Sequence, residues 1–163
     1  MTLIRPATPT DYPEILAIWT PIIRDTIVTF ASSDKTPETL AEYVEGRRAR
    51  GRETFVAEKE RSIVGFASYD QFRSGDGYIH AMEHTVILGP KARGLGLGRA
   101  LMAAIEDHAR DRGGHTMVAG ISAENTPAIA FHSAIGYQKA GHLPQSGRKF
   151  GRWLDLVLMQ KIL

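Results

Sequence analysis

A glycine-rich turn between a predicted strand and a predicted long helix constrains this chain more than any other feature. Residues 83–100 read EHTVILGPKARGLGLGRA, in which the β-prone run 84–88 leads through Gly89-Pro90 into the turn 93–98. A helix N-terminus leaves about four backbone N–H groups without partners and carries roughly half a positive charge. Glycines allow positive φ angles and the close approach of a ligand to the backbone. The turn therefore predicts a site for a phosphate or pyrophosphate, and a glycine-rich connection that binds nothing is the alternative.

The composition predicts one soluble globular domain that spans residues 1–163. Hydrophobic residues make up 43% of the chain and charged residues 23%, and no run approaches the roughly 18 apolar residues of a membrane span. The absence of cysteine excludes disulfides and thiolate chemistry. The N-terminal sequence lacks the basic and apolar regions of a signal peptide, so a cytoplasmic location is expected. A net charge of +2 with mostly scattered basic residues argues against a nucleic-acid partner.

Strand-like and helix-like segments alternate in a way that predicts an α/β fold. β-prone runs form a three-stranded meander, a βαβ unit follows around the glycine-rich turn, and a helix and two strands close the chain. Apolar residues from Ile15 to Ile23 recur at helical spacing. Expected strands cover residues 3–5, 54–58, 62–72, 78–88, 116–121, 137–142 and 153–161, and expected helices cover residues 11–23, 36–51, 96–112 and 125–135.

Three boundaries in this scheme depend on local signals. Thr10-Asp11 followed by Glu14 predicts the cap and capping box of the first helix. The turn residues 74–77 place the start of a long strand at Tyr78. The polar segment 144–152 predicts a connection between the last two strands.

Several motifs in a fixed order resemble the GNAT family of acyl-CoA-dependent N-acyltransferases. The pattern Arg93-x-x-Gly96-x-Gly98 lies between a strand and a helix, after a meander and before a strand, Asn125, a helix and Gly136-Tyr137. The resemblance covers nearly the whole chain. The closest branch is similar to the phosphinothricin and methionine sulfoximine acetyltransferases, through residues 83–86, 131–137 and 147–155.

The resemblance implies a fold and an activity. The fold would be a single GNAT domain over residues 1–163, with a mixed, mostly antiparallel central sheet flanked by helices on both faces. The activity would be transfer of acetyl from acetyl-CoA to the α-amine of a small amino acid or analogue, such as methionine sulfoximine, methionine sulfone or phosphinothricin. The branch also implies a homodimer, to which residues 144–153 would contribute.

The resemblance also implies a binding site for coenzyme A. Backbone N–H groups of the turn would bind the pyrophosphate, two arginines would add charge, and a strand backbone would pair with the pantetheine amides. A dinucleotide fingerprint would instead follow the first strand, with an acid about twenty residues on. Asn125 would bind the pantetheine arm or serve as an ordinary helix cap. The full set is Val86, Ile87, Leu88, Arg93, Gly94, Leu95, Gly96, Leu97, Gly98, Arg99 and Asn125.

Two residues are candidates for the acid and base. An α-amine has a pKa near 8 and must lose a proton before it attacks a thioester, so a base with a pKa near the working pH is useful. Glu83 is the candidate base, directly or through a water. His132 stands where most members of the family have a tyrosine, and its imidazole could act as acid or base. Tyr137 is the weaker donor because it aligns with a core aromatic. A strand N–H near Val86 would stabilise the oxyanion.

Substrate recognition rests on fewer residues. Arg73 aligns with an arginine of the branch and could bind a substrate carboxylate through its forked guanidinium. The chain has Phe72 and Ser74 beside it where those relatives tend to have Trp and Pro. Further candidates are Phe30, Tyr78, Lys149 and Arg152, of which Arg152 could instead pair with Asp155.

Three other functions compete with this hypothesis. His80-x-x-Glu83-His84 matches a zinc-protease pattern that needs both histidines on one helix face, whereas its surroundings favour a strand. No metal is therefore expected. A non-catalytic module that binds coenzyme A would not need both Glu83 and His132. An acetyltransferase of protein or peptide N-termini would share the fold and the acetyl donor.

Overall fold

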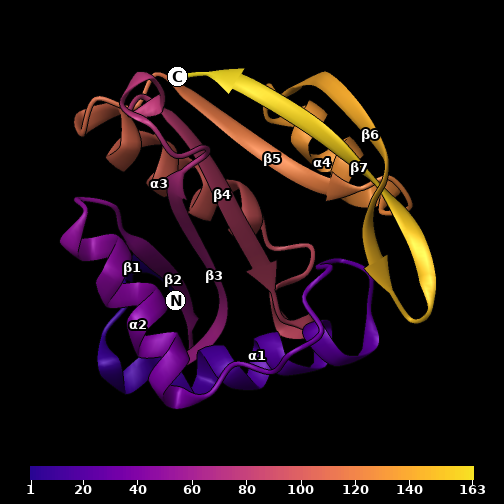
Figure 1. The fold of residues 1–163 in the computed structure, drawn as a ribbon. Coiled ribbons are helices and arrows are strands. Elements are labelled where there is room, and N and C mark those ends of the chain that lie inside the picture. Colours follow the sequence, from indigo (N-terminus) through magenta and orange to yellow (C-terminus); the bar gives the residue numbers. More distant parts are fainter.

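The computed structural model describes all residues from 1 to 163 and shows one seven-stranded sheet with helices on both faces (Figure 1). The strand order is β1-β2-β3-β4-β5-β7-β6, and all neighbours are antiparallel except β4 and β5. None of the helices is long and apolar enough to cross a membrane. The strands are β1 (Thr2–Pro6), β2 (Thr54–Lys59), β3 (Ser62–Gln71), β4 (Ala81–Leu88), β5 (Thr116–Ser122), β6 (Gln138–Lys149) and β7 (Arg152–Ile162), and the helices are α1 (Tyr12–Asp25), α2 (Pro37–Ala49), α3 (Leu97–Asp111) and α4 (Thr126–Ala134).

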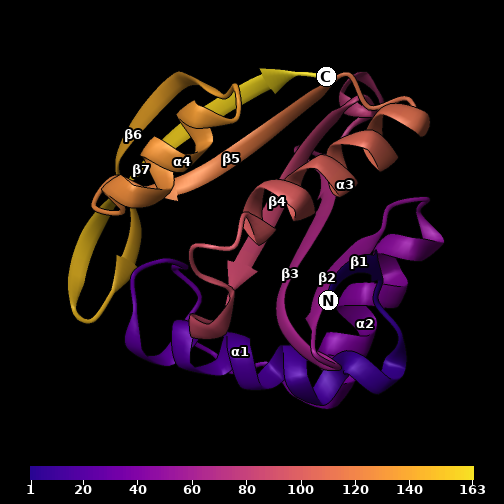
Figure 2. The same cartoon turned by 180° about the vertical axis from the view of Figure 1, so that it is seen from behind.

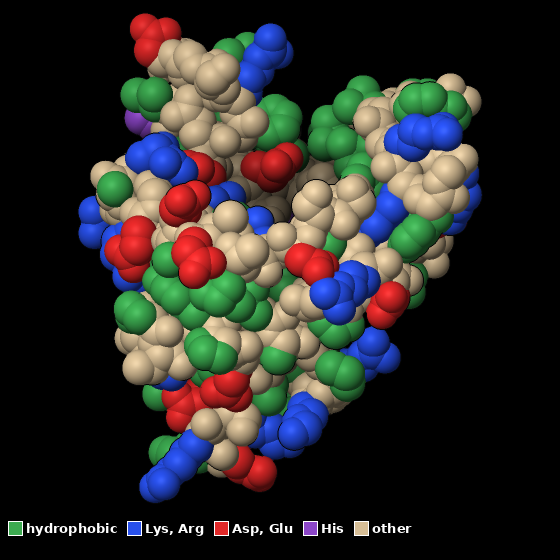
Figure 3. All heavy atoms as spheres, turned by 60° about the horizontal axis from the view of Figure 1, so that its bottom comes forward, with side chains coloured by type: hydrophobic (Ala, Val, Ile, Leu, Met, Phe, Trp, Pro, Cys, Tyr) green, Lys and Arg blue, Asp and Glu red, His purple; other side chains and the backbone are tan.

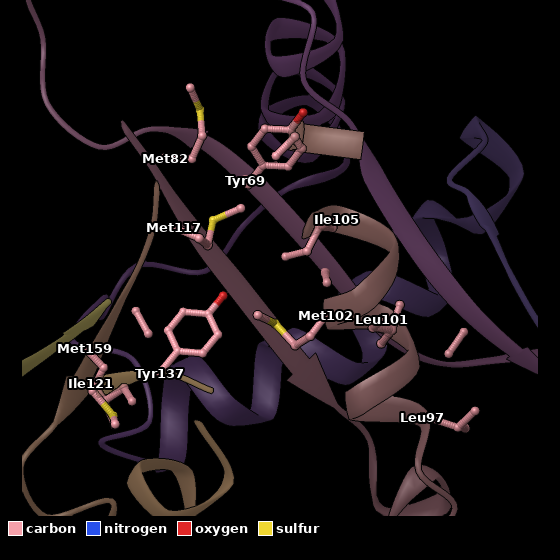
Figure 4. Close-up of a cluster of buried hydrophobic side chains, with 14 of the residues drawn as sticks. Tyr69, Met82, Leu97, Leu101, Met102, Ile105, Met117, Ile121, Tyr137 and Met159 are labelled. Atoms are coloured by element: carbon pink, nitrogen blue, oxygen red, sulfur yellow. The ribbon is translucent and has the colours of Figure 1, made fainter. Parts of the chain in front are cut away.

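The two faces of the sheet carry separate hydrophobic cores. Under α1 and α2 the core contains Ile15, Trp19, Leu40, Val44 and Phe66. Figure 2 shows α3 and α4 covering the opposite face. Figure 4 shows the core of that face, where apolar side chains of α3 meet methionines of the strands; its labelled members include Leu97, Leu101, Ile105, Met82, Met117 and Met159. The predicted three-layer architecture is therefore confirmed.

The sheet splits between β4 and β5. These parallel strands pair only from Ala81 opposite Thr116 to Glu83 opposite Val118. Beyond Glu83, β4 continues to pair with β3 and β5 continues to pair with β7. Each strand is therefore left with an unpaired inner edge. Figure 3 shows the molecule hollowed between the part built by β1–β4 and the part built by β5–β7.

The first helix begins where predicted, with Asp11 as its N-cap, but its capping box differs from the prediction. A 3-10 turn, η1 (Pro9–Asp11), precedes α1, and the capping box joins Thr8 and Asp11 rather than Thr10 and Glu14. Asp11 accepts hydrogen bonds from the Thr8 backbone at 2.7 Å and from both terminal nitrogens of Arg5 at 2.8 Å. The Asp11 carboxylate therefore binds the Arg5 guanidinium as well as the Thr8 backbone, whereas the local pattern predicted only a capping role for it. Glu14 instead accepts a hydrogen bond from the Ile63 backbone.

Two strand boundaries also differ from the prediction. Tyr78 belongs to the 3-10 turn η2 (Asp76–Tyr78), and β4 begins only at Ala81. The strand predicted from Tyr78 was therefore three residues too long at its start. The polar segment 144–152 is largely the far end of the β6–β7 hairpin, in which Gly147 pairs with Leu154 and Lys149 with Arg152. Cross-strand hydrogen bonds extend an exposed hairpin even where its side chains are polar, so composition underestimated both strands.

Candidate active site

A cavity of about 720 Å³ occupies the split between β4 and β5. It joins the glycine-rich turn, the free edge of β4, the start of α4 and the loop after α1. The lining comprises Trp19, Val28, Thr29, Phe30, residues 84–88, Arg93, Gly94, Gly98, residues 119–122, Asn125, Pro127, Ala128, Phe131, His132 and Leu156.

The glycine-rich turn presents unpaired backbone donors. Gly94 and Gly96 have positive φ angles of 73° and 71°, and α3 starts at Leu97. No protein acceptor takes a hydrogen bond from the backbone N–H groups of residues 93–99; the first satisfied one is that of Ala100, at 3.1 Å from the Gly96 carbonyl. Donors at the N-terminus of a 15-residue helix suit a phosphate or pyrophosphate. The geometry thus fits the anion predicted for this turn.

Gly98 allows close packing beside these donors. A Cβ at this position would lie 3.2 Å from Cδ1 of Leu88 and 3.3 Å from Cζ of Phe131. Both neighbours line the cavity. Leu97 is buried in the core and offers a ligand only its backbone N–H, whereas the side chains of Leu95 and Arg99 lie at the surface.

The free edge of β4 supplies alternating donors and acceptors. Ala81 and Gly89 use their backbone groups toward β3 and its continuation, and the carbonyl of Ile87 also faces β3, beside Gly65. Because strand residues alternate, the backbone groups of His84, Val86 and Leu88 face the split. Val86 and Leu88 therefore suit an added extended ligand as predicted. The backbone of Ile87 is committed to the sheet, which the sequence did not indicate.

Asn125 has the capping role that the sequence allowed, and one of its side-chain groups remains free. It is the cap of α4, and its Oδ1 accepts a hydrogen bond from the Ala128 backbone at 3.3 Å. Its side-chain amide nitrogen has no protein partner and the residue lines the cavity. Capping therefore leaves a donor available to a ligand.

Glu83 lies at the point where the sheet splits. It is opposite Asp70 on β3 and is the last β4 residue paired with β5. Its Oε2 lies 3.6 Å from the position that a Cβ on Gly120 would occupy, which places the carboxylate against a residue of the cavity lining. Partial loss of hydration raises the pKa of Glu83, and the positive charge of Arg47 opposes that shift. A carboxylate with a raised pKa beside a cleft is suited to accept a proton.

His84 and His132 form a buried imidazole pair. Their Nε2 atoms are 3.1 Å apart and the rings stack at 13°. Nδ1 of His132 lies 2.7 Å from the Ala128 carbonyl, which can only accept, so we assign the proton to that nitrogen. Nε2 of neutral His132 then accepts from Nε2–H of His84. Burial lowers the pKa of both rings, that of His84 to about 3.

This arrangement limits what His132 can donate. Both of its ring nitrogens have protein partners, so a proton-donor role toward a substrate requires the bond to His84 to break. Nδ1 of His84 is buried and has no partner. The sequence analysis gave His84 no role of its own outside the zinc pattern and the family motif 83–86. Its place next to Glu83 in a strand could have indicated a buried neighbour of the site.

Tyr137 is a core residue, as predicted. Its hydroxyl donates a hydrogen bond to Glu106 at 2.9 Å, and Lys161 donates to the same carboxylate at 2.7 Å. Burial, followed by the charge of Glu106, raises the pKa of Tyr137 strongly.

The loop after α1 forms one wall of the cavity. Phe30 lines the cavity and packs against Gly147, where any Cβ would overlap its ring. Lys149 is buried and donates hydrogen bonds to the carbonyls of Thr26 at 2.6 Å and Thr29 at 2.8 Å. Phe30 therefore lies at the site, as predicted. Lys149 instead fixes the loop after α1 to β6, which corrects its predicted role as a substrate contact.

The remaining predicted substrate residues lie outside the cavity lining. Arg73 and Tyr78 are exposed on the loop between β3 and β4, where the guanidinium lies 5.3 Å from the ring centroid. Arg152 forms an exposed ion pair with Glu124 at 2.6 Å. Its expected alternative partner, Asp155, binds His142 and the Gln145 backbone instead.

The zinc pattern does not form a metal site. Glu83 and His84 lie in β4 and not on a helix, and Nδ1 of His80 is 2.7 Å from the Gly113 carbonyl. No three acidic or histidine side chains converge as ligands. The condition that this pattern needs is therefore not met.

The unpaired donors of the turn and the free edge of β4 suit a long ligand that carries a phosphate and amide groups, as an acyl-CoA does. The model of the acetyltransferase (GNAT) family matches residues 17–137. The chain belongs to this family and is an acyltransferase.

Known proteins extend the likeness over most of the chain. An L-methionine sulfoximine/L-methionine sulfone acetyltransferase of Salmonella typhimurium is 42% identical over 78% of this chain and 76% of its own length. The crystal structure of a ribosomal-protein-alanine N-acetyltransferase from Brucella melitensis has a TM-score of 0.95 and 42% identity, and covers 99% of both chains. The structure of yncA from Salmonella typhimurium with its cofactor acetyl-CoA has a TM-score of 0.94 and 35% identity, and covers 99% of this chain and 94% of that one.

Proposed function

We propose that this enzyme transfers acetyl from acetyl-CoA to the α-amine of a small amino acid or analogue, of the methionine sulfoximine, methionine sulfone or phosphinothricin type. The observation that carries the proposal is the position of Glu83, whose pKa is raised, where the free edge of β4 begins. The relative named for methionine sulfoximine and methionine sulfone supports this substrate class.

The acetyl donor would lie along the split. Backbone donors of residues 93–98, with the charges of Arg93 and Arg99, would hold the pyrophosphate. Val86, Leu88 and the Asn125 amide would pair with the pantetheine arm. The relative solved with acetyl-CoA supports this assignment.

The reaction needs one proton acceptor and one oxyanion site. Glu83 takes a proton from the substrate ammonium, and the freed amine forms a bond to the thioester carbonyl carbon. A β4 backbone N–H facing the split stabilises the negative oxygen. The carbon–sulfur bond then breaks, the attacking nitrogen releases its surplus proton, and the departing thiolate takes up one proton to leave as the free thiol. His132 and His84 would form the wall behind the reacting atoms.

A second candidate is acetylation of protein or peptide N-termini. The Brucella relative named as a ribosomal-protein-alanine N-acetyltransferase favours it. Its chemistry at Glu83 would be the same, and only the group beyond the α-carbon of the substrate would differ.

A panel of amines separates the two candidates. Thiol release from acetyl-CoA is measured with methionine sulfoximine, methionine sulfone, phosphinothricin, free methionine and an alanine-initiated peptide. We expect kcat/KM to be at least about tenfold higher for one of the free amino-acid analogues than for the peptide. Release with peptides alone would refute the proposed substrate class.

We also propose a cytoplasmic homodimer. The hairpin of β6 and β7 exposes Leu143, Phe150 and Trp153 by 45%, 57% and 57%, an apolar set suited to a second copy. Acetyl-CoA is an intracellular metabolite, which supports the location. Sedimentation velocity should give twice the mass of one chain, and Trp153→Glu should shift the protein toward monomer. A wild-type monomer at micromolar concentration would contradict the dimer.

A further inference from the structure

Two cations without acidic partners lie against one tyrosine ring on the α1–α2 face of the sheet. The Arg47 guanidinium carbon is 3.4 Å from the centroid of the Tyr43 ring. The Lys35 ammonium is 5.0 Å from the same centroid and 4.6 Å from that of Trp19. Neither cation forms an ion pair, whereas Arg48 and Arg50, at the same end of α2, both do.

The same cluster contains buried donors that no protein acceptor satisfies. Nε of Arg47 and the hydroxyl of Tyr43 are both buried without a hydrogen-bond partner. The only hydrogen bond of the Arg47 guanidinium is a long one of 3.4 Å to the Tyr43 carbonyl. Buried donors are normally paired, and leaving one unpaired is unfavourable. Two adjacent donors with two positive charges therefore suit an anion.

Trp19 is the member of the cluster that lines the cavity, and Arg47, Lys35 and Tyr43 lie outside the lining. The Trp19 ring rests on Phe66 at 4.8 Å and meets Tyr43 edge-on at 5.2 Å. Phe66 on β3 is opposite Ile87 on β4. Thr85 and Glu83 precede Ile87 on β4 by two and four residues, so their side chains lie on the same face of the sheet as that of Ile87. The charge of Arg47 is close enough to lower the pKa of Glu83 against the effect of lost hydration.

The neighbouring acid, Asp70, forms no ion pair with Arg47, although the charge of Arg47 contributes to lowering the pKa of Asp70. Asp70 accepts a hydrogen bond from Arg50 at 2.5 Å and another from the Gln71 backbone at 2.9 Å. Lys35 is half-buried, and its pKa is lowered first by burial and then by the charge of Arg47. A bound anion between the two cations would relieve both unfavourable effects.

We propose that Arg47, assisted by Lys35 and the Tyr43 hydroxyl, binds the α-carboxylate of the amino-acid substrate whose amine lies at Glu83. The inference rests on the proposed function and deepens it, because it makes a free carboxylate a requirement for the substrate. The amine and the carboxylate of an amino acid share one carbon, so an anion site beside Glu83 selects α-amino acids over simple amines and over peptide N-termini. A planar guanidinium pairs with a carboxylate through two parallel hydrogen bonds.

The test compares an amino acid with its own amide. Thiol release is measured with methionine sulfone and with methionine sulfone α-amide, for the wild type, Arg47→Met, Arg47→Lys, Arg73→Met and Arg110→Met. Methionine preserves the packing on Tyr43 without the charge. Arg110→Met is the matched control, since Arg110 is a surface arginine of α3 paired with Asp107.

We expect Arg47→Met to raise the KM for methionine sulfone by about 10–100-fold, with little change for the amide, because only the acid loses a charge-assisted pair. Arg47→Lys should recover part of the loss, Arg110→Met should match the wild type, and the KM for acetyl-CoA should stay constant. Equal losses for acid and amide would overturn the subsite, as would loss of the acid preference in Arg73→Met but not in Arg47→Met. A wild type that turns over no amino-acid analogue would instead defeat the proposed function.

Discussion

Glu83→Gln lowers kcat/KM for the amine by about 10²–10⁴-fold, because the amide cannot take the proton from the substrate ammonium. The KM for acetyl-CoA should remain within about twofold of the wild type, because acetyl-CoA is held by the turn and the edge of β4 and not by Glu83. The measurement is thiol release under saturating acetyl-CoA, with calorimetric titration of the donor as the binding control. Wild-type turnover in Glu83→Gln would remove Glu83 as the base.

The pH profile gives an independent reading of the same residue. Glu83 acts as a base only when ionised, so kcat/KM falls as the pH drops through its pKa. Because lost hydration raises that pKa, the fall should occur above the ordinary range of glutamate. The acidic limb should disappear in Glu83→Gln. An unchanged limb in this variant would assign it to another group.

His132→Phe is the comparison that separates proton transfer from positioning. The ring of His132 accepts a hydrogen bond from Nε2–H of His84 and has no free N–H of its own. Replacing this ring should therefore lower turnover less than Glu83→Gln does. The acidic limb of the pH profile should persist in this variant. A loss as large as that of Glu83→Gln, together with a missing alkaline limb, would restore His132 as the acid.

Gly98→Val raises the KM and the Kd for acetyl-CoA by about 10–100-fold. A β-branched side chain at this position collides with Leu88 and Phe131, which lie 3.2 and 3.3 Å from its Cβ and form the cavity wall. The strain also displaces the backbone donor of Gly98 from its place in the turn. The measurement is calorimetric titration with acetyl-CoA, and circular dichroism checks the fold.

The matched control for Gly98→Val is Gly77→Val. Gly77 has an ordinary φ, and a Cβ built there meets nothing within 4 Å. This variant should bind acetyl-CoA as the wild type does. A wild-type Kd in Gly98→Val would show that close packing at this glycine does not shape the donor site.

Features of this fold that depend on neighbouring residues were predictable from the sequence, and features that depend on distant residues were not. The turn 93–98, the cap at Asn125 and the apolar spacing of α1 and α3 are set by neighbours within a few residues, and the sequence predicted all of them. The features that it missed involve other partners. Asp11 forms the capping box with Thr8 and also pairs with Arg5, and cross-strand pairing extends β6 to Lys149.

By itself, the sequence determined the α/β architecture and the glycine-rich turn at the start of α3, because periodicity and glycine spacing are written in adjacent residues, and with the family resemblance it made Glu83 the candidate base. Only the tertiary structure decided that β4 and β5 part after Glu83, that His84 pairs with His132 from 48 residues away, and that Lys149 ties down the loop beside Phe30. It also placed the charge of Arg47 near enough to oppose the rise in the pKa of Glu83. Each of these depends on how separate elements pack against one sheet, and no local pattern encodes that packing.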